Sequence, residues 1–401
     1  MKKIISVLLS LCLVCAGIVS FASCAQSGAD GDTIYVGVYE PASGSNGAGG
    51  KQETLGVKYA NSVKNTVTVG GKTYNVELVI VDNESNDDKA ISAATQLINK
   101  NVSVVLGSYG SSVSIAAADT FKGAHLPAIG ITCTNPKVTS DSEYYFRACF
   151  LDPFQGTVLA NYAKDKGVAK AYVLAEQGNA YDVGLASYFK SAFGTEDVDF
   201  KYETFQRGMS DFSSYIESAM NFGATAIFAP TSIEYATLII DTAKAKNYTG
   251  LLLAGDTWDS NKIVEAATGS ALDIEVTTFY QEGASKEFDE GFVAWMEADA
   301  ERMTENGGNT MISAVSTMGY DAYMTALYAI EHAAVEDGQK PTRDQIRDAL
   351  AAMNSVDNAY AGVTGAIYFD ATGDAVRESA YIKKVNTSSG AWDFVKEQKA
   401  N

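Results

Sequence analysis

Histidine and basic residues are scarce in this chain. Its 401 residues include two histidines, and 30 lysines and arginines stand against 49 aspartates and glutamates, which gives a net charge of −19 at pH 7. His125 and His332 are too few and too scattered for a histidine metal site or a serine–histidine–aspartate triad. Because nucleic acids are bound by basic surfaces, the acidic balance excludes them as partners. It also argues against electrostatic binding to anionic lipid.

Long apolar runs are confined to the N-terminus. The uncharged stretch Ile4–Val19 follows Lys2 and Lys3 and is short for a membrane span, so residues 1–23 are predicted to be a cleaved signal peptide. The sequence Phe21-Ala22-Ser23-Cys24 resembles a bacterial lipobox. This predicts lipidation of Cys24 and a flexible spacer over residues 24–32, and two acyl chains on one cysteine suffice for stable anchoring. The alternative is an ordinary secretory signal in which this cysteine has no role.

Cysteine is rare in the remainder of the chain, where only Cys133 and Cys149 occur. They could pair outside the cell or be two small buried residues, and nothing in their spacing demands a bridge, which favours buried thiols. We expect no metal site and no cofactor. No later segment is apolar for long enough to span a bilayer.

The rest of the chain predicts an α/β protein with doubly wound parallel sheets. Hydrophobic content of 46% and charged content of 20% describe a globular protein with a core, and the length favours two domains. A β-rich run, Thr33–Tyr39, precedes a Gly/Ser loop, a helix from about Lys51 and a hairpin turning at Gly70-Gly71. Strands and helices then alternate to about Phe146, and a second round begins at Asp152. No Pro/Ser-rich linker separates the halves, so we expect several crossings that act as a hinge.

The last third is predicted to be mainly helical and then β-rich. Apolar side chains recur on one face in two segments, and such stripes are core far more often than a ligand site. A helix over Thr342–Met353 is expected to precede a β-rich tail. The two stripes are Phe288, Phe292, Trp295, Met296 and Met303, and Tyr320, Tyr323, Met324, Leu327 and Tyr328.

Two polar turns in the first half follow neighbouring predicted strands. Val102–Leu106 leads into a Gly/Ser turn that opens a helix at about Ser111, and Leu126–Ile131 leads into the polar corner 132–136. Open α/β sheets bind ligands at this carboxyl edge. The unpaired N–H groups of a helix start favour an anion, and Ser111 adds a hydroxyl donor. The alternative is that Ser111 is only the helix N-cap, but Ser112 could cap the helix equally well, which leaves Ser111 free to bind a carboxylate.

The second half carries acids at equivalent turns. Tyr181 and Asp182 follow the strand Ala171–Leu174, and Asp256 and Asp259 follow Leu251–Leu253. We expect Asp259 to be the N-cap of the next helix, which leaves Asp256 to bind a cation. With Tyr181 as a closing donor, these groups would clamp a zwitterion.

Enzyme motifs are absent or incomplete, and the protein is not expected to be an enzyme. Ser111 has no Gly-x-Ser-x-Gly context and no histidine base at a strand end. The segment Gly44–Lys51 lacks the spacing of a phosphate loop. Its glycines are interpreted as a loop that lets the backbone approach a ligand.

Short stretches along the chain also occur in the order and spacing of one known family. They are Ile34–Val38 with Pro41 and Gly44, Val79–Asn83, Val104–Ser112, Thr134–Pro136, Phe146-Arg147, Gln155-Gly156, Ala180–Gly184, Asp211–Ser213, Gly255–Ser260, and Gly362–Gly365 with Phe369-Asp370. On these residues the mature chain resembles the leucine/isoleucine/valine-type substrate-binding proteins of ABC importers. The resemblance implies the type I periplasmic binding protein fold, with two lobes joined by three strands. Lobe 1 would comprise residues 33–151 and 278–361, and lobe 2 residues 152–277 and 362–401.

The resemblance also implies roles for individual residues. Ser111 and Thr134 would bind the ligand carboxylate, and the backbone carbonyl of Thr132 would contact the ammonium. Tyr181 would close over the ligand, and Asp256 would pair with the ammonium. The remaining expected ligand-binding residues are Tyr109, Gly110, Cys133 and Trp258.

The side-chain pocket departs from the family pattern. Thr231-Ser232 stand where the family has tyrosines, Gly47–Gly50 where it has an aromatic residue, and Cys133 where it has a small apolar residue. The ligand's side chain is therefore left open. The resemblance implies a monomeric extracytoplasmic lipoprotein that delivers an amino acid to a membrane permease. The alternative is the same fold acting as a membrane-tethered sensor or binding another small solute, such as an amide, a urea-like compound or a carboxylate.

Overall fold

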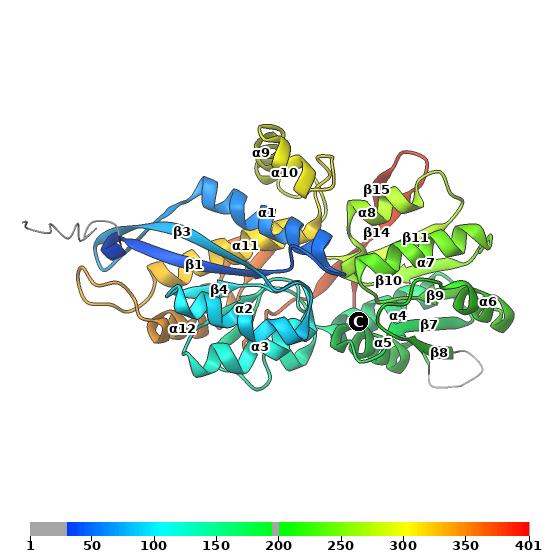
Figure 1. Cartoon of the computed structure of the whole chain (residues 1–401), viewed down its shortest axis with the longest axis horizontal. Coiled ribbons are helices and arrows are strands. Elements are labelled where there is room, and N and C mark those ends of the chain that lie inside the picture. Colours follow the sequence, from blue (N-terminus) through cyan, green and yellow to red (C-terminus); the bar gives the residue numbers. More distant parts are fainter. Residues whose placement is uncertain (1–29, 195–199, 401) are drawn as a thin grey trace, which may run out of the picture.

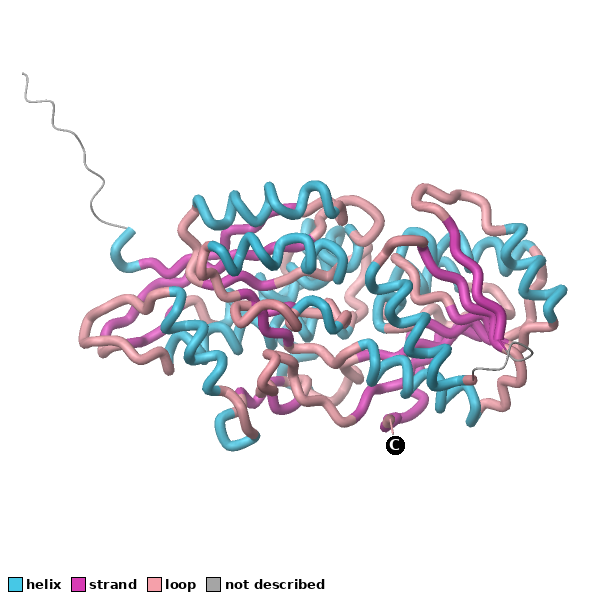
Figure 2. The backbone as a smooth tube through the Cα atoms, turned by 90° about the horizontal axis from the view of Figure 1, so that it is seen from below, coloured by secondary structure: helices cyan, strands magenta, loops and turns pink. Residues whose placement is uncertain are grey.

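Two lobes, each with a central sheet between helices, lie side by side in the computed structural model (Figures 1 and 2). The structure describes residues 30–194 and 200–400. The expected signal peptide and Cys24 lie outside the described residues. Within the described ranges, no helix combines the length and apolar character that a membrane crossing requires.

Lobe 1 is built on a six-stranded sheet in the order β2-β3-β1-β4-β5-β6. Its strands pair in parallel, apart from the antiparallel hairpin β2–β3 that turns at Gly70-Gly71. The strands are β1 Thr33–Glu40, β2 Thr66–Val69, β3 Lys72–Asp82, β4 Val104–Leu106, β5 Ala128–Gly130 and β6 Tyr145–Arg147. The helices are α1 Gly47–Val63, α2 Asp87–Asn99, α3 Ser111–Gly123, α9 Lys286–Glu297, α10 Ala300–Glu305, α11 Ala314–Glu331 and α12 Arg343–Ala352.

The pleat of these strands explains why helices cover both faces of the lobe 1 sheet. Successive side chains on a strand point to opposite faces. Val36 and Val38 enter the cluster that includes α1 and α11, whereas Tyr39 packs with α2 and α3. The aromatic stripe of α9 packs with Leu55 of α1, so its predicted core role is confirmed.

Lobe 2 is built on a seven-stranded sheet in the order β15-β14-β11-β10-β9-β7-β8. The five strands β7 to β11 pair in parallel, and β14 and β15 add an antiparallel edge. The strands are β7 Ala171–Glu176, β8 Phe200–Phe205, β9 Ala226–Phe228, β10 Leu251–Ala254, β11 Asp273–Thr278, β14 Ser379–Asn386 and β15 Ala391–Lys399. The helices are α4 Asp152–Asp165, α5 Ala180–Phe193, α6 Ser213–Phe222, α7 Ile233–Ala245 and α8 Asn261–Ala267.

The described chain passes between the lobes after β6, after β11 and before β14. The short hairpin β12 Tyr360–Gly362 and β13 Gly365–Ile367 packs beside α11 of lobe 1. Ala375 donates its N–H to the carbonyl of Arg147, 3.1 Å away, so this segment still belongs to lobe 1. The sequence-based boundary at residue 362 falls within that hairpin.

The α/β fold with two doubly wound lobes is confirmed, but the start of α1 was misplaced. Gly47, Ala48, Gly49 and Gly50 form the first turn of the helix, whereas the sequence predicts a loop up to Lys51. A Cβ on Gly49 would lie 2.4 Å from ring carbons of Tyr109, and one on Gly50 would lie 2.1 Å from the carbonyl oxygen of Pro41. Close packing at this turn therefore overrides the poor helix propensity of glycine.

Candidate functional site

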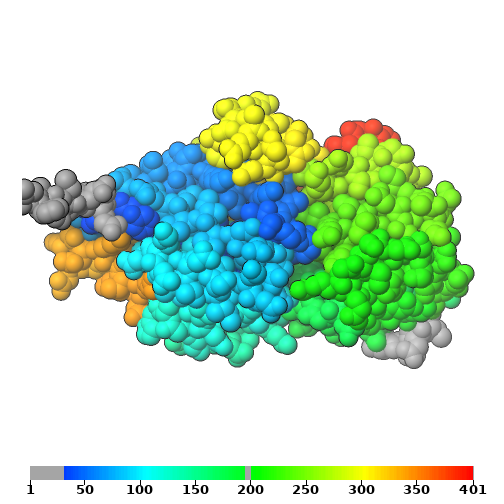
Figure 3. Space-filling view, in the orientation of Figure 1, coloured from blue at the N-terminus to red at the C-terminus, as the bar shows by residue number. Residues whose placement is uncertain are grey.

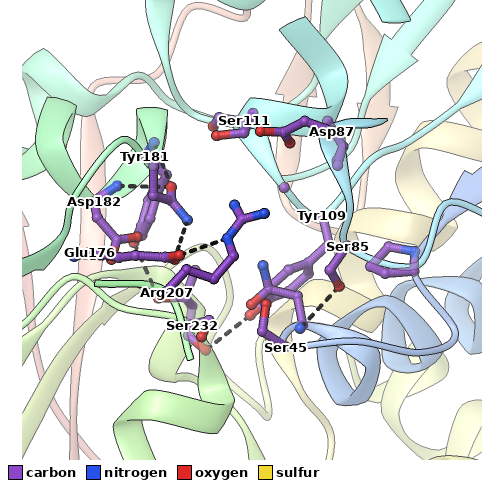
Figure 4. Close-up of a pocket in the computed structure, with 17 residues that line it drawn as sticks. Ser45, Ser85, Asp87, Tyr109, Ser111, Glu176, Tyr181, Asp182, Arg207 and Ser232 are labelled. Atoms are coloured by element: carbon purple, nitrogen blue, oxygen red, sulfur yellow. Dashed lines mark hydrogen bonds and ion pairs between the residues drawn. The ribbon is translucent and has the colours of Figure 1, made fainter. Parts of the chain in front are cut away.

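A small cavity of about 30 Å³ lies between the lobes, at the carboxyl ends of the parallel strands (Figure 4). Figure 3 shows the two lobes in contact along the boundary that contains it. Lobe 1 contributes the loop before α1, the start of α2 and the β4–α3 turn. Lobe 2 contributes the β7–α5 turn and residues that follow β8, β9 and β10. Of the nine expected ligand-binding residues, Tyr109, Gly110, Ser111 and Tyr181 line this cavity.

Direct hydrogen bonds hold the lobes together around the cavity. Tyr109 Oη donates to the carbonyl of Thr257 at 2.9 Å. The N–H of Ala180 donates to Ser112 Oγ at 2.9 Å, and Asn135 Nδ2 donates to the carbonyl of Ala180 at 2.7 Å. Neither Ser111 nor Ser112 caps the helix, because Gly110 occupies the N-cap position and the side chain of Ser112 bonds the opposite lobe.

Ser111 is the first residue of α3 and lies where the sequence predicts a carboxylate binder. Its side chain is 1% exposed, and Oγ accepts a hydrogen bond from the N–H of Asn135 at 3.2 Å. This bond uses the oxygen as an acceptor, so the hydroxyl proton can still be donated to a ligand. The first N–H groups of α3 have no intrahelical acceptor and add to a positive potential there.

Asp256 lies in lobe 2, directly behind Tyr181. Its Oδ1 accepts hydrogen bonds from Gln155 Nε2 at 2.7 Å and from Tyr181 Oη at 3.0 Å. Its Oδ2 is buried and has no hydrogen-bond partner. Burial raises the pKa of Asp256 to about 6. A buried carboxylate with one unsatisfied oxygen is a binding point for a cationic group.

A second acid, Glu53 of α1, belongs to the same region and was not predicted. Glu53 is fully buried and accepts a hydrogen bond from Thr132 Oγ1. Burial raises its pKa to about 8, and the charge of Asp256 acts in the same direction. The only available signal was spacing: Gly49, Glu53 and Gly56 fall on one helical face, where an acid among glycines indicates close packing.

Glu40 supports this acid from the end of β1. Its carboxylate accepts the N–H of Tyr109 at 2.7 Å. Burial, and after it the neighbouring Glu53, raises the pKa of Glu40 well above the usual value. The two carboxyl groups therefore share protons rather than both ionising. The two carboxyl groups beside Tyr109 are therefore largely protonated and carry little charge.

The other expected ligand-binding residues lie behind the cavity lining. Thr134 is fully buried at the polar corner, and the neighbouring Cys133 belongs to the lobe 1 core, where burial raises the thiol pKa to about 11. Trp258 belongs to the lobe 2 core, with Nε1 donating to Thr231 Oγ1 at 3.4 Å. Cys133 and Cys149 are free, buried thiols, as predicted.

Arg147, at the end of β6, fixes the polar corner that carries Thr132 and Thr134. Its guanidinium is fully buried and donates to the carbonyls of Cys133 and Asn135, each at 2.8 Å. Nε pairs with Asp374 Oδ1 at 2.5 Å. The polar corner is thus bonded to the segment before β14, which is one of the segments by which the chain passes between the lobes. This crossing therefore lies next to the site.

Asp259 does not cap the next helix, contrary to the prediction. Ser260 is the N-cap of α8 and accepts from the N–H of Lys262. Asp259 instead accepts a hydrogen bond from Lys383 Nζ at 3.1 Å, and both side chains are buried. Lys383 lies on β14, far along the chain, so sequence spacing gave no indication of the pair.

Arg207 is a further cavity residue that the sequence did not indicate. It follows β8, and its Nε donates to Glu176 Oε1 at 2.9 Å. Figure 4 shows its guanidinium pointing into the cavity, with Asp87 of lobe 1 also in the lining. Among the residues that the structure describes, no group of three or more histidines, cysteines or acids is placed to hold a metal ion.

Comparison with known proteins identifies the family. The model of the periplasmic binding protein family matches residues 33–391. The chain belongs to this family. It is 29% identical to a Leu/Ile/Val-binding protein homologue of Brucella abortus over 284 residues, which cover 70% of this chain and 73% of that one. A second homologue, from Brucella melitensis, is 30% identical over 219 residues, 53% of this chain and 57% of that one.

Solved structures agree with this assignment. A leucine-binding protein from Thermotoga maritima is 30% identical, with a TM-score of 0.78 over 91% of this chain and 99% of that one. A branched-chain amino acid transporter substrate-binding protein from Streptococcus pneumoniae, solved with isoleucine, has a TM-score of 0.75 at 24% identity, over 91% and 99% of the two chains. A solute-binding protein from R. palustris, solved with benzoate, has the same TM-score at 20% identity, over 91% and 96%. The last two show the shared fold.

Proposed function

We propose that this periplasmic binding protein captures a free amino acid outside the cytoplasm and delivers it to an ABC permease. The observation that carries the proposal is the unsatisfied, buried Oδ2 of Asp256 in lobe 2, opposite the helix start at Ser111 in lobe 1. Tyr181 lines the cavity together with Ser111 and donates to Asp256, which lies behind the lining. An α-ammonium would bind at Asp256 and an α-carboxylate at Ser111.

Each end of this clamp suits one charge of a zwitterion. A helix start with a hydroxyl donor favours an anion, and a desolvated carboxylate favours a cation. The residues would bind and orient the solute without reacting with it. The proposal includes delivery by a monomer anchored to the bacterial membrane through lipidated Cys24, which the lipobox-like sequence supports.

The test is a thermal-shift and calorimetric screen of the purified protein against the twenty amino acids. Saturation at a hundred times the dissociation constant should raise the free energy of unfolding by about 2.7 kcal/mol. Propionate and ethylamine serve as matched controls, because each keeps one charged end of alanine. We expect neither to stabilise the protein as an amino acid does.

If small carboxylates bind and no amino acid does, the proposal is wrong. Asp256 would then be a structural group, and the protein would bind a solute without an ammonium. Arg207 in the cavity lining would favour a carboxylate as that solute. A sensor role would be separated from import by uptake of the labelled ligand in cells that lack the protein.

A further inference from the structure

The part of the cavity between the loop before α1 and the start of α7 carries polar groups that bind nothing within the protein. Ser232, the residue before α7, is 3% exposed and lines the cavity, and its Oγ has no hydrogen-bond partner. Asn46, the residue before α1, also lines the cavity, and its Oδ1 is buried without a partner. The two loops meet, because the N–H of Glu234 donates to the carbonyl of Ser45 at 3.3 Å.

Asn46 and Ser232 form their hydrogen bonds through the backbone, so their side chains are not needed to hold the loops. The N–H of Asn46 donates to Ser85 Oγ at 3.1 Å. Ser232 does not cap α7 with its side chain, although it occupies the N-cap position. A buried hydroxyl and a buried amide oxygen, one from each lobe, are therefore available to a ligand.

The space beside these groups is small. The ring of Tyr109 lies against Gly49, where a Cβ would approach it to 2.4 Å, and its hydroxyl is bound to Thr257. Tyr109 therefore fills volume that a long apolar side chain would need. A short ligand side chain at this place would meet Asn46 and Ser232 rather than an apolar wall.

The charges of the lining disfavour a charged side chain. Arg207 is the one basic residue among those that line the described cavity, and its Nε already pairs with Glu176. Asp182 of lobe 2 and Asp87 of lobe 1 are two further acids in the lining. An acidic side chain would meet these three acids, and a basic one would meet the guanidinium. A neutral side chain avoids both repulsions.

We infer that the site selects an amino acid with a small neutral side chain that carries a hydroxyl or amide, over an apolar side chain of the same shape. This inference rests on the proposed amino acid function and adds the ligand class. An apolar side chain would leave Ser232 Oγ and Asn46 Oδ1 buried and unsatisfied when the lobes close. Such a loss corresponds to about a tenfold to a hundredfold weaker affinity.

The test compares isosteric ligand pairs by calorimetry: threonine with valine, and asparagine with leucine. We expect the polar member of at least one pair to bind ten to a hundred times more tightly. The variant Ser232→Ala should reduce the threonine–valine ratio to within about threefold, chiefly by weakening threonine. Thr237→Ala is the matched control, since that hydroxyl is exposed on the same helix and bonds only its own turn. It should leave the ratio unchanged.

The outcomes separate this inference from the proposed function. If valine and leucine bind as tightly as their polar partners, the inference is wrong and the amino acid function stands. Aspartate or lysine binding ten times more tightly than both threonine and asparagine would refute the charge argument. An equal loss of threonine and valine in Ser232→Ala would show that this serine does not discriminate side chains. If no amino acid binds, the proposed function itself fails.

Discussion

The substitution Asp256→Asn should weaken ligand binding while it stabilises the folded protein. Asparagine has nearly the same shape and keeps an oxygen that can accept from Gln155 and Tyr181. It removes the negative charge that we assign to the ligand ammonium. A hydrogen bond to a charged group contributes roughly 1.5–3 kcal/mol, so the dissociation constant should rise about tenfold to more than a hundredfold.

The stability effect has the opposite sign because the carboxylate is buried without a cation. A pKa raised from 3.8 to about 6 means that the folded state binds the proton more tightly than the unfolded state. Above pH 6 this makes the protein less stable by roughly 3 kcal/mol relative to an unperturbed aspartate. Asp256→Asn should recover part of this lost stability at pH 8, which would raise the melting temperature by about 2 °C or more. At pH 5, where Asp256 is mostly protonated, the gain should be small.

The assay is a thermal melt at pH 5 and pH 8, combined with calorimetric titration of the amino acid that the screen identifies. Asp259→Asn is the control, because it breaks the buried pair with Lys383. That variant should lose roughly 3–5 kcal/mol of stability. In Asp259→Asn the ligand should still raise the melting temperature. An unchanged dissociation constant in Asp256→Asn would refute the assignment of this carboxylate to the ammonium.

Four further results are expected. Ser111→Ala should weaken amino acid binding about tenfold to a hundredfold, measured by calorimetry, because it removes a hydroxyl donor to the carboxylate; equal affinity would exclude that role. Affinity should fall as the pH drops through about 6, by up to tenfold per pH unit, because protonation neutralises Asp256. The free energy of unfolding should rise as the pH drops, because Asp256 and Glu53 then regain their protons. Titrations and thermal melts from pH 4.5 to 8 check both signs. Gly49→Ala should displace Tyr109 and reduce stability by about 1–3 kcal/mol, whereas Gly123→Ala, which meets nothing within 4 Å, should not. Cys24→Ser should move the protein from the membrane fraction to the soluble fraction, and a persistent membrane pool would contradict lipidation.

Groups that follow a strand could be located from the sequence, because local pattern identifies the strand ends. Ser111 and Tyr181, which line the cavity, and Asp256, which lies behind the lining, were predicted in this way, because each follows a strand at the carboxyl edge of its own sheet. Glu53 was missed because a helix interior carries no such signal. Arg207 follows β8, so the same signal was present there and was not used. A cap on the nearest helix was considered for Ser112 and predicted for Asp259, since N-caps are local. Their actual partners, Ala180 and Lys383, lie 68 and 124 positions away in the chain.

The charges across the cleft explain why the ligand should drive closure. Glu53 of lobe 1 and Asp256 of lobe 2 are close enough that the charge of one raises the pKa of the other. Bringing the lobes together therefore concentrates buried acid, and the direct interlobe hydrogen bonds each contribute only about 1 kcal/mol net. In the proposed complex the ligand's ammonium would offset the cost of burying these acids, of which Glu53 is largely protonated without it, and would do so only in the closed form. A ligand shifts a conformational equilibrium by its difference in affinity for the two states, so the acids on both lobes make closure dependent on the ligand's positive charge.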